Sequence, residues 1–191
     1  MKKILLMSFL ILFSATVFGQ NLKVKQSEIQ WKAYKALNSD AFSHYGTVQL
    51  KAGDVTVNKS RQITGGNFIL DMKTIVADDM KGDRQKIYLE NHLKSDDFFD
   101  VDNYPTVFFK IVSVKNQPGK GTNSIVTGNL TIRKTTKTIS FPANITWEGN
   151  TLKFVSGDFS FNRQDFGLTY NVFEDMIIRD EVEMHVKFSA K

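Results

Sequence analysis

The side chains best suited to acid–base chemistry or metal binding are three histidines, His44, His92 and His185. No two of them have the spacing of a paired-histidine metal motif, and no nucleophile motif of a hydrolase is present. The chain has no cysteine, which excludes thiolate catalysis, disulfides and cysteine-ligated zinc. Glycine-rich phosphate-binding loops are also missing. We therefore predict no catalytic residues, no metal site and no cofactor.

Four aspartates, Asp96, Asp97, Asp100 and Asp102, form a dense acidic group. Such a group could suggest a calcium site, but the segment lacks the central glycine and the distal glutamate of a helix–loop–helix calcium loop. We interpret these side chains as solvated carboxylates around the end of a helix.

Three other polar residues could contact the polar head of a ligand. Arg163 and Asp165 flank a turn at the end of an aromatic strand. A salt bridge that closes the end of a barrel is favoured there over a ligand contact. His44 stands at the start of a predicted strand, where a structural hydrogen bond and a site role are about equally supported. His185 lies on the polar face of its strand and is interpreted as a solvated side chain.

Alternation of apolar and polar residues identifies the elements that would position these groups. Residues 181–188 show it most clearly, because apolar side chains occupy every second position, and residues 138–148 repeat the pattern. Residues 151–162 change phase near Ser156 and Gly157, which predicts a bulge inside one strand. Further strands are expected at 27–37, 44–51, 54–58, 61–72, 106–115 and 123–133, with turns between most of them.

Residues 79–95 break this rhythm, and their Lys, Glu, Gln, Leu and Met content favours a helix. About nine short strands at regular spacing are typical of a barrel or a sandwich. The charged insertion and the interrupted strands favour a soluble barrel with an inward apolar face over an outer-membrane barrel. The expected fold is all-β, an antiparallel barrel of about eight strands with one helical insertion.

Residues 1–19 have the pattern of a cleaved signal peptide. Lys2 and Lys3 precede an apolar run, and the small residues Val17 and Gly19 suit cleavage before Gln20. A membrane anchor is the alternative, but a spanning helix needs about 20 apolar residues and this run is shorter. We expect residues 20–191 to form one domain in the periplasm or outside the cell, with no stable membrane insertion.

The formal net charge of +5 includes Lys2 and Lys3, so the exported part is only mildly basic. A nucleic-acid-binding domain usually carries a strong basic stripe, and none is visible, so no nucleic-acid partner is expected. The 16 phenylalanines can instead build or line a large apolar interior. A closed barrel of about eight strands either fills with its own side chains or holds one small ligand.

Four stretches, in order along the chain, resemble the YceI-like family. They are Gly65-Gly66-Asn67-Phe68 with Asp71-Met72, His92 to Val101 followed by Tyr104 to Phe109, Thr127 to Arg133 continuing to Pro142, and Phe159 to Gly167. One departure is Lys134, where the family often has glycine. The resemblance implies an exported lipocalin-like barrel that binds polyisoprenoids or other lipids without catalysis, and the helix at 79–95 would cover one end.

The implied partner is an amphiphilic lipid such as a polyisoprenoid, an isoprenoid quinone or a fatty-acyl chain, and a homodimer is left open. The expected polar-head contacts are Arg163, Asp165 and His44. By phase and position, the expected apolar walls are Phe68, Leu70, Phe109, Ile111, Phe141, Ile145, Trp147, Phe154, Met184 and Val186.

Two other functions stay open at this point. The barrel could be filled by its own side chains, which would suit a structural or stress-related interaction protein. An enzyme is the third reading, but no nucleophile–base pair supports it.

Overall fold

The computed structural model describes residues 19–35, 43–80, 82–169 and 178–191. Apart from Gly19, the predicted signal peptide lies outside the described residues. The strands are β1 (Gln20–Lys35), β2 (Ser43–Val57), β3 (Ile63–Ala77), β4 (Thr106–Gly119), β5 (Thr122–Ile132), β6 (Thr135–Glu148), β7 (Thr151–Ser156), β8 (Phe159–Asn162) and β9 (Ile178–Ala190). The helices are α1 (Asp83–Lys94) and a short 3-10 turn, η1 (Arg163–Phe166).

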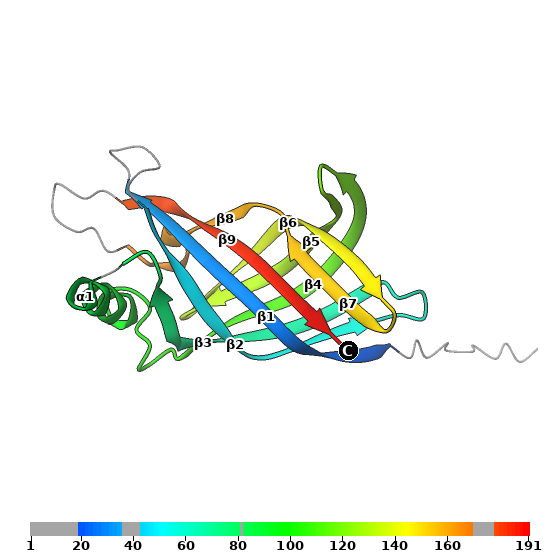
Figure 1. Ribbon diagram of the computed structural model, residues 1–191, viewed down its shortest axis with the longest axis horizontal. Coiled ribbons are helices and arrows are strands. Elements are labelled where there is room, and N and C mark those ends of the chain that lie inside the picture. The colour runs from blue at the N-terminus through cyan, green and yellow to red at the C-terminus, as the bar shows by residue number, and fades with distance from the viewer. Residues whose placement is uncertain (1–18, 36–42, 81, 170–177) are drawn as a thin grey trace, which may run out of the picture.

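The strands form one closed antiparallel barrel (Figure 1). Neighbours pair in chain order from β1 to β7, β7 pairs with β9, and β9 also pairs with β1 and so closes the sheet. β7 pairs with the last part of β9, and β8 pairs with an earlier part on the same side of β9. The two short strands therefore act together as one strand of the barrel, which has eight strands around its circumference. Among the described strands, β8 pairs with β9 alone. The predicted all-β barrel with one helical insertion is confirmed.

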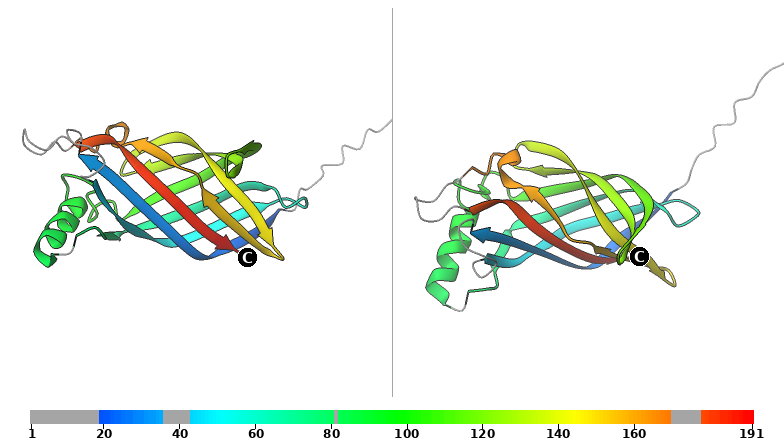
Figure 2. Two further views of the ribbon diagram at one scale, coloured as in Figure 1. Left: turned by 45° about the horizontal axis from the view of Figure 1, so that its top comes forward. Right: turned by 90° about the horizontal axis from the view of Figure 1, so that it is seen from above.

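Helix α1 lies at one end of the barrel, and the C-terminus lies toward the other end in all views (Figures 1 and 2). The helix falls within the predicted range of 79–95. Its last turn is closed by the Ser95 amide, which donates to the carbonyls of Asn91 and His92. We call this end of the barrel the helix end.

The predicted break between residues 51 and 54 is wrong, because β2 runs through this segment without interruption. Gly53 lies in the gap between the predicted strands 44–51 and 54–58, where a turn is expected, but it pairs with Phe68 of β3. A Cβ atom at Gly53 would lie 2.9 Å from both Leu50 Cδ2 and Val24 Cγ2. The glycine allows close packing across three strands, and pairing with both neighbours overrides its turn propensity.

The predicted single strand over 151–162 is divided into β7 and β8. The break comes where the phase changes, at Gly157 and Asp158. The amide of Gly157 donates to the carbonyl of Pro142 at 2.8 Å, and Ser156 Oγ accepts from the amide of Val186 at 2.9 Å. These two hydrogen bonds join the segment at the break to β6 and β9, so the chain stays attached to the barrel between β7 and β8.

Buried apolar residues gather in two clusters along the barrel. At the helix end, Leu93 of α1 and Phe98 pack with Trp31, Met72 and Phe166. The second cluster fills the interior toward the other end, and its members that are at most 2% exposed are Leu22, Val55, Val57, Val126, Ala143, Leu152 and Ala190. The cavity described below is lined by members of both clusters.

Candidate functional site

The barrel interior contains a cavity of about 160 Å³. Among the residues that the structure describes, its wall consists of alanine, valine, isoleucine, leucine, methionine, phenylalanine and tryptophan, without a charged side chain. Leu93, Phe98 and Phe99, from α1 and the segment after it, contribute to this wall. A wall of this composition offers apolar contact and no charge, and it suits a hydrocarbon group.

Most of the predicted wall residues line this cavity. They are Phe68, Leu70, Phe109, Ile111, Phe141, Phe154, Met184 and Val186. Within this wall the rings of Phe141 and Phe159 stack, with centroids 4.2 Å apart. Phe109, Met184 and Val186 are only half-buried although they face the interior. Their incomplete burial is consistent with free space beside them.

Ile145 and Trp147 lie outside the cavity wall. Both share the inward phase of β6 with Phe141, but they stand farther along the strand, where packed side chains fill the barrel. The indole N–H of Trp147 donates to the carbonyl of Arg61 at 3.2 Å, and the Arg61 guanidinium lies 5.0 Å from the ring centroid. Phase identifies the face of a residue, but it does not tell how far along the barrel the cavity extends.

Several wall residues were not predicted from the sequence. β1 contributes Ile29, Trp31 and Ala33, and β2 contributes Val48 and Leu50. The same period-two alternation that identified the C-terminal strand is present in both segments, and it would have identified these positions.

Arg163 is a buried structural residue and is not positioned to contact the head group of a ligand. It is 1% exposed, donates to the carbonyl of Leu168, and forms an ion pair with Asp180 Oδ1 at 3.0 Å. The observed ion pair of Arg163 thus joins it to Asp180 of β9, whereas Asp165, the partner considered in the sequence, is exposed. The pair fastens η1 to the start of β9.

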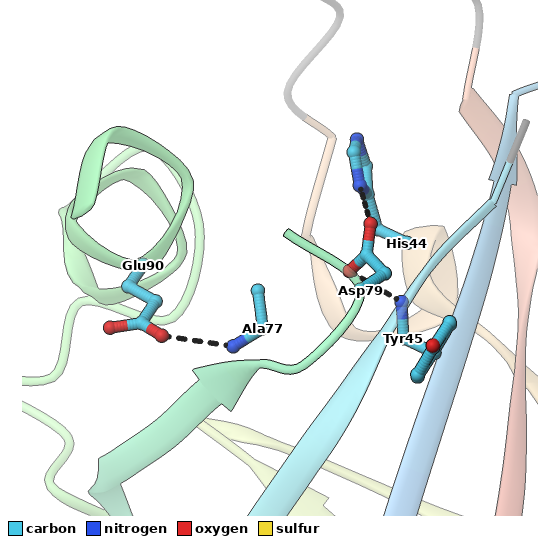
Figure 3. A network of polar contacts seen from close by, with 5 residues as sticks. All are labelled: His44, Tyr45, Ala77, Asp79 and Glu90. Atoms are coloured by element: carbon cyan, nitrogen blue, oxygen red, sulfur yellow. Dashed lines mark hydrogen bonds and ion pairs between the residues drawn. The ribbon is translucent and has the colours of Figure 1, made fainter. Parts of the chain in front are cut away.

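His44 belongs to a polar network that attaches the segment before α1 to the barrel (Figure 3). His44 Nδ1 lies 2.8 Å from Asp79 Oδ2, and the amide of Tyr45 donates to Asp79 Oδ1 at 3.1 Å. From the helix, Glu90 Oε1 accepts a 3.0 Å bond from the amide of Ala77. These contacts come from β2, β3 and α1, and they hold the helix end together.

Replacing Glu90 with alanine should loosen this attachment. The amide of Ala77, a residue that is 0% exposed, would lose its acceptor, which costs about 1–3 kcal/mol. Chemical unfolding should report this loss, and amide exchange at Ala77 should accelerate. Glu90→Gln keeps an acceptor oxygen and is the control. Equal exchange rates in both variants would show that the bond does not fasten the helix.

His92, on α1, makes stability at the helix end dependent on pH. Burial lowers the pKa of His92 below its ordinary value of 6.5, and the nearby Asp97 carboxylate opposes this shift. Because the unfolded chain takes up the proton more readily, this contribution is complete above pH 6.5 and is lost as the pH falls below it. We expect His92→Gln to lose less stability than the native protein between pH 7.5 and about pH 5. Equal losses in urea unfolding would contradict this.

The four clustered aspartates are mostly exposed, as predicted, with Asp96, Asp97 and Asp102 at the surface. Asp100 is half-buried and lies 3.8 Å from Arg133 Nη2. Among the described helices, none is long and apolar enough to cross a membrane.

The model of the YceI-like domain family matches residues 21–190. The chain belongs to the YceI-like family. This confirms the resemblance seen in the four sequence stretches.

Among curated proteins, a UPF0312 protein of Pseudomonas paraeruginosa is 33% identical over 92 residues, or 44% of this chain and 47% of that protein. A UPF0312 protein of Pseudomonas aeruginosa is 30% identical over 116 residues, or 54% of this chain and 59% of that protein. The chain thus spans about half the length of the curated relatives it matches.

Two solved structures share the fold. BcnA of Burkholderia cenocepacia superposes with a TM-score of 0.67 at 19% identity, over 86% of this chain and 96% of that chain. A Campylobacter jejuni YCEI protein superposes with a TM-score of 0.51 at 16% identity, over 99% of this chain and 97% of that chain.

Proposed function

We propose that this YceI-like protein is a non-catalytic binding protein that encloses the hydrocarbon chain of an amphiphilic lipid in its barrel. The observation that carries the proposal is the cavity of about 160 Å³ with an entirely apolar wall. An engineered apolar cavity of about 150 Å³ stays dry and binds benzene, so a cavity of this size accepts a hydrocarbon group.

The energetics favour occupation of this cavity. At about 24 cal/mol per Å³, an empty cavity of this size costs the fold about 4 kcal/mol. A hydrocarbon group that fills it restores lost dispersion contacts and removes its own apolar surface from water. Each additional buried CH₂ contributes about 0.8 kcal/mol, before the cost of ordering the chain.

A long chain needs more room than the present cavity. The half-buried side chains of Phe109, Phe159 and Met184 border the free space and could shift to admit further carbons. The far end of the barrel is closed by Val55, Val57 and Leu152. A head group would therefore leave the barrel at the helix end, where His44 and Asp79 supply polar contacts.

Export would bring the protein into contact with lipids of the cell envelope. The pattern of residues 1–19 supports export to the periplasm or the medium. N-terminal sequencing of protein from the native cell should begin at Gln20, and an uncleaved N-terminus would contradict export by this route.

The direct test of the function is extraction of lipid from the protein purified from its native cell. Mass spectrometry of the organic extract should reveal an amphiphilic lipid in stoichiometric amounts. The protein from which bound lipid has been removed, called the stripped protein below, should bind a fluorescent fatty acid. Absence of both signals would contradict the proposal and favour a barrel that serves only as a structural or interaction module.

A further inference from the structure

One part of the cavity wall does not belong to the sheet. Leu93 of α1 and the following Phe98 and Phe99 line the cavity, whereas the other described wall residues all lie on strands. Backbone hydrogen bonds join the strands to one another around the barrel. Parting two strands would leave backbone groups unpaired, which is costly. A ligand therefore reaches the cavity with least disruption where these three side chains move aside.

The segment after α1 is fastened to the helix by its own backbone. The amide of Phe99 donates to the carbonyl of Leu93 at 3.2 Å, and the amide of Val101 donates to the carbonyl of Lys94 at 3.0 Å. Because of these bonds, the segment can move together with α1. We call residues 83–101 the helical segment.

Arg133 connects the helical segment to the barrel from the turn between β5 and β6. Its Nη1 atom donates to the carbonyl of Phe98 at 3.2 Å, and its Nη2 atom lies 3.8 Å from Asp100 Oδ2. The bond from the amide of Ala77 to Glu90 attaches the same segment to β3. Arg133 is not part of the cavity wall. It therefore holds the helical segment in place from outside the space that a ligand would fill.

The backbone is unusual on both sides of this contact. Arg133 has a φ of 52° and Asp100 has a φ of 49°, so both adopt the left-handed conformation that favours glycine. Residues held in such conformations cluster at ligand clamps and switch regions. Glycine would suit the backbone at position 133 better, but it would lose both contacts of the guanidinium.

We infer that the helical segment is a lid that opens to admit and release the ligand, and that Arg133 is the latch that keeps it closed. This inference rests on the proposed function and adds its regulation. Entry and exit both pass through the open state, so loss of the latch should speed both equally. The dissociation constant should stay the same, because the latch stabilises the closed state with and without ligand.

The test replaces Arg133 with glycine, which fits the left-handed backbone and removes the guanidinium. Stopped-flow fluorescence gives the association and dissociation rates of a fluorescent fatty acid with the stripped protein. We expect both rates to rise about tenfold in Arg133→Gly, as for the loss of one hydrogen bond from a charged donor. The dissociation constant from equilibrium titration should not change.

Arg61→Gly is the matched control. Arg61 is also left-handed, with a φ of 61°, and its guanidinium donates to the carbonyl of Gly149 at 3.0 Å. It lies in the turn between β2 and β3, at the end of the barrel away from α1 (Figure 1). Removing it takes away a strained arginine with a similar contact, but it should leave both rates unchanged.

Asp100→Asn replaces the first variant if Arg133→Gly folds poorly. Asparagine tolerates the left-handed backbone and carries no charge. Both rates should rise by about threefold, less than for Arg133→Gly, since the bond to the carbonyl of Phe98 remains. Unchanged rates in the variant tested, or faster dissociation with unchanged association, would overturn the lid while leaving lipid binding intact. Failure of the native protein to bind the fatty acid would contradict the proposed function itself and the inference with it.

Discussion

Met184→Trp should reduce the affinity for a fluorescent fatty acid by about a hundredfold. Met184 lines the cavity and is half-buried, so a larger ring at this position would occupy space that the hydrocarbon chain needs. Excluding four CH₂ groups removes about 3 kcal/mol of binding free energy at ~0.8 kcal/mol each, which corresponds to two orders of magnitude. Fluorescence titration of the stripped protein gives the dissociation constant.

The stability of this variant distinguishes a cavity from a filled core. Overpacking a filled core usually costs 1–3 kcal/mol. In the proposed cavity the same substitution should leave the free energy of unfolding nearly unchanged or raise it. His185→Trp, one residue along β9 on the opposite face, is the matched control and should not affect binding. Clear destabilisation of Met184→Trp with unchanged binding would contradict the account.

Phe141→Trp should reduce both the affinity for the fatty acid and the stability of the fold. Phe141 is 5% exposed, and its ring stacks on that of Phe159 with centroids 4.2 Å apart. A larger ring at this position should block the chain and also strain the wall. Loss of both binding and stability is therefore expected at Phe141, in contrast to loss of binding alone at Met184.

Leu152→Ala should destabilise the protein by roughly 3–4 kcal/mol, because Leu152 is 0% exposed in the filled end of the barrel. For a domain of this size that loss lowers the melting temperature by about 10 °C. Thermal unfolding of the stripped protein measures it. Binding by the folded protein should change little, since Leu152 does not line the cavity.

Val155→Ala is the control for this prediction. Val155 lies on the same strand, β7, but points to the outer face and is 37% exposed. Its truncation should cost much less. Equal losses in the two variants would show that the closed end of the barrel is not packed as described.

Alternation in the sequence predicts much of the fold, because a strand with one buried face must place apolar side chains at every second position. Phe141, Met184 and Val186 were assigned to the inner face in this way, and all three line the cavity. The charged insertion and the interrupted strands favoured a soluble barrel, and the YceI-like resemblance implies the same fold.

The remaining features depend on contacts between residues far apart in the sequence. Gly53 resembles a turn residue until its packing against Val24 and Phe68 is known. The ion pair of Arg163 with Asp180 depends on how β9 meets η1.

The most direct test of the account is to locate a bound acyl chain in solution. The stripped protein is mixed with isotope-labelled dodecanoic acid, and intermolecular nuclear Overhauser effects to protein methyl groups are recorded. The account predicts contacts from the alkyl chain to Met184, Met72 and Val126, which line the cavity. Contacts confined to outward residues such as Val112, or saturable binding without any contact to the cavity methyls, would contradict it.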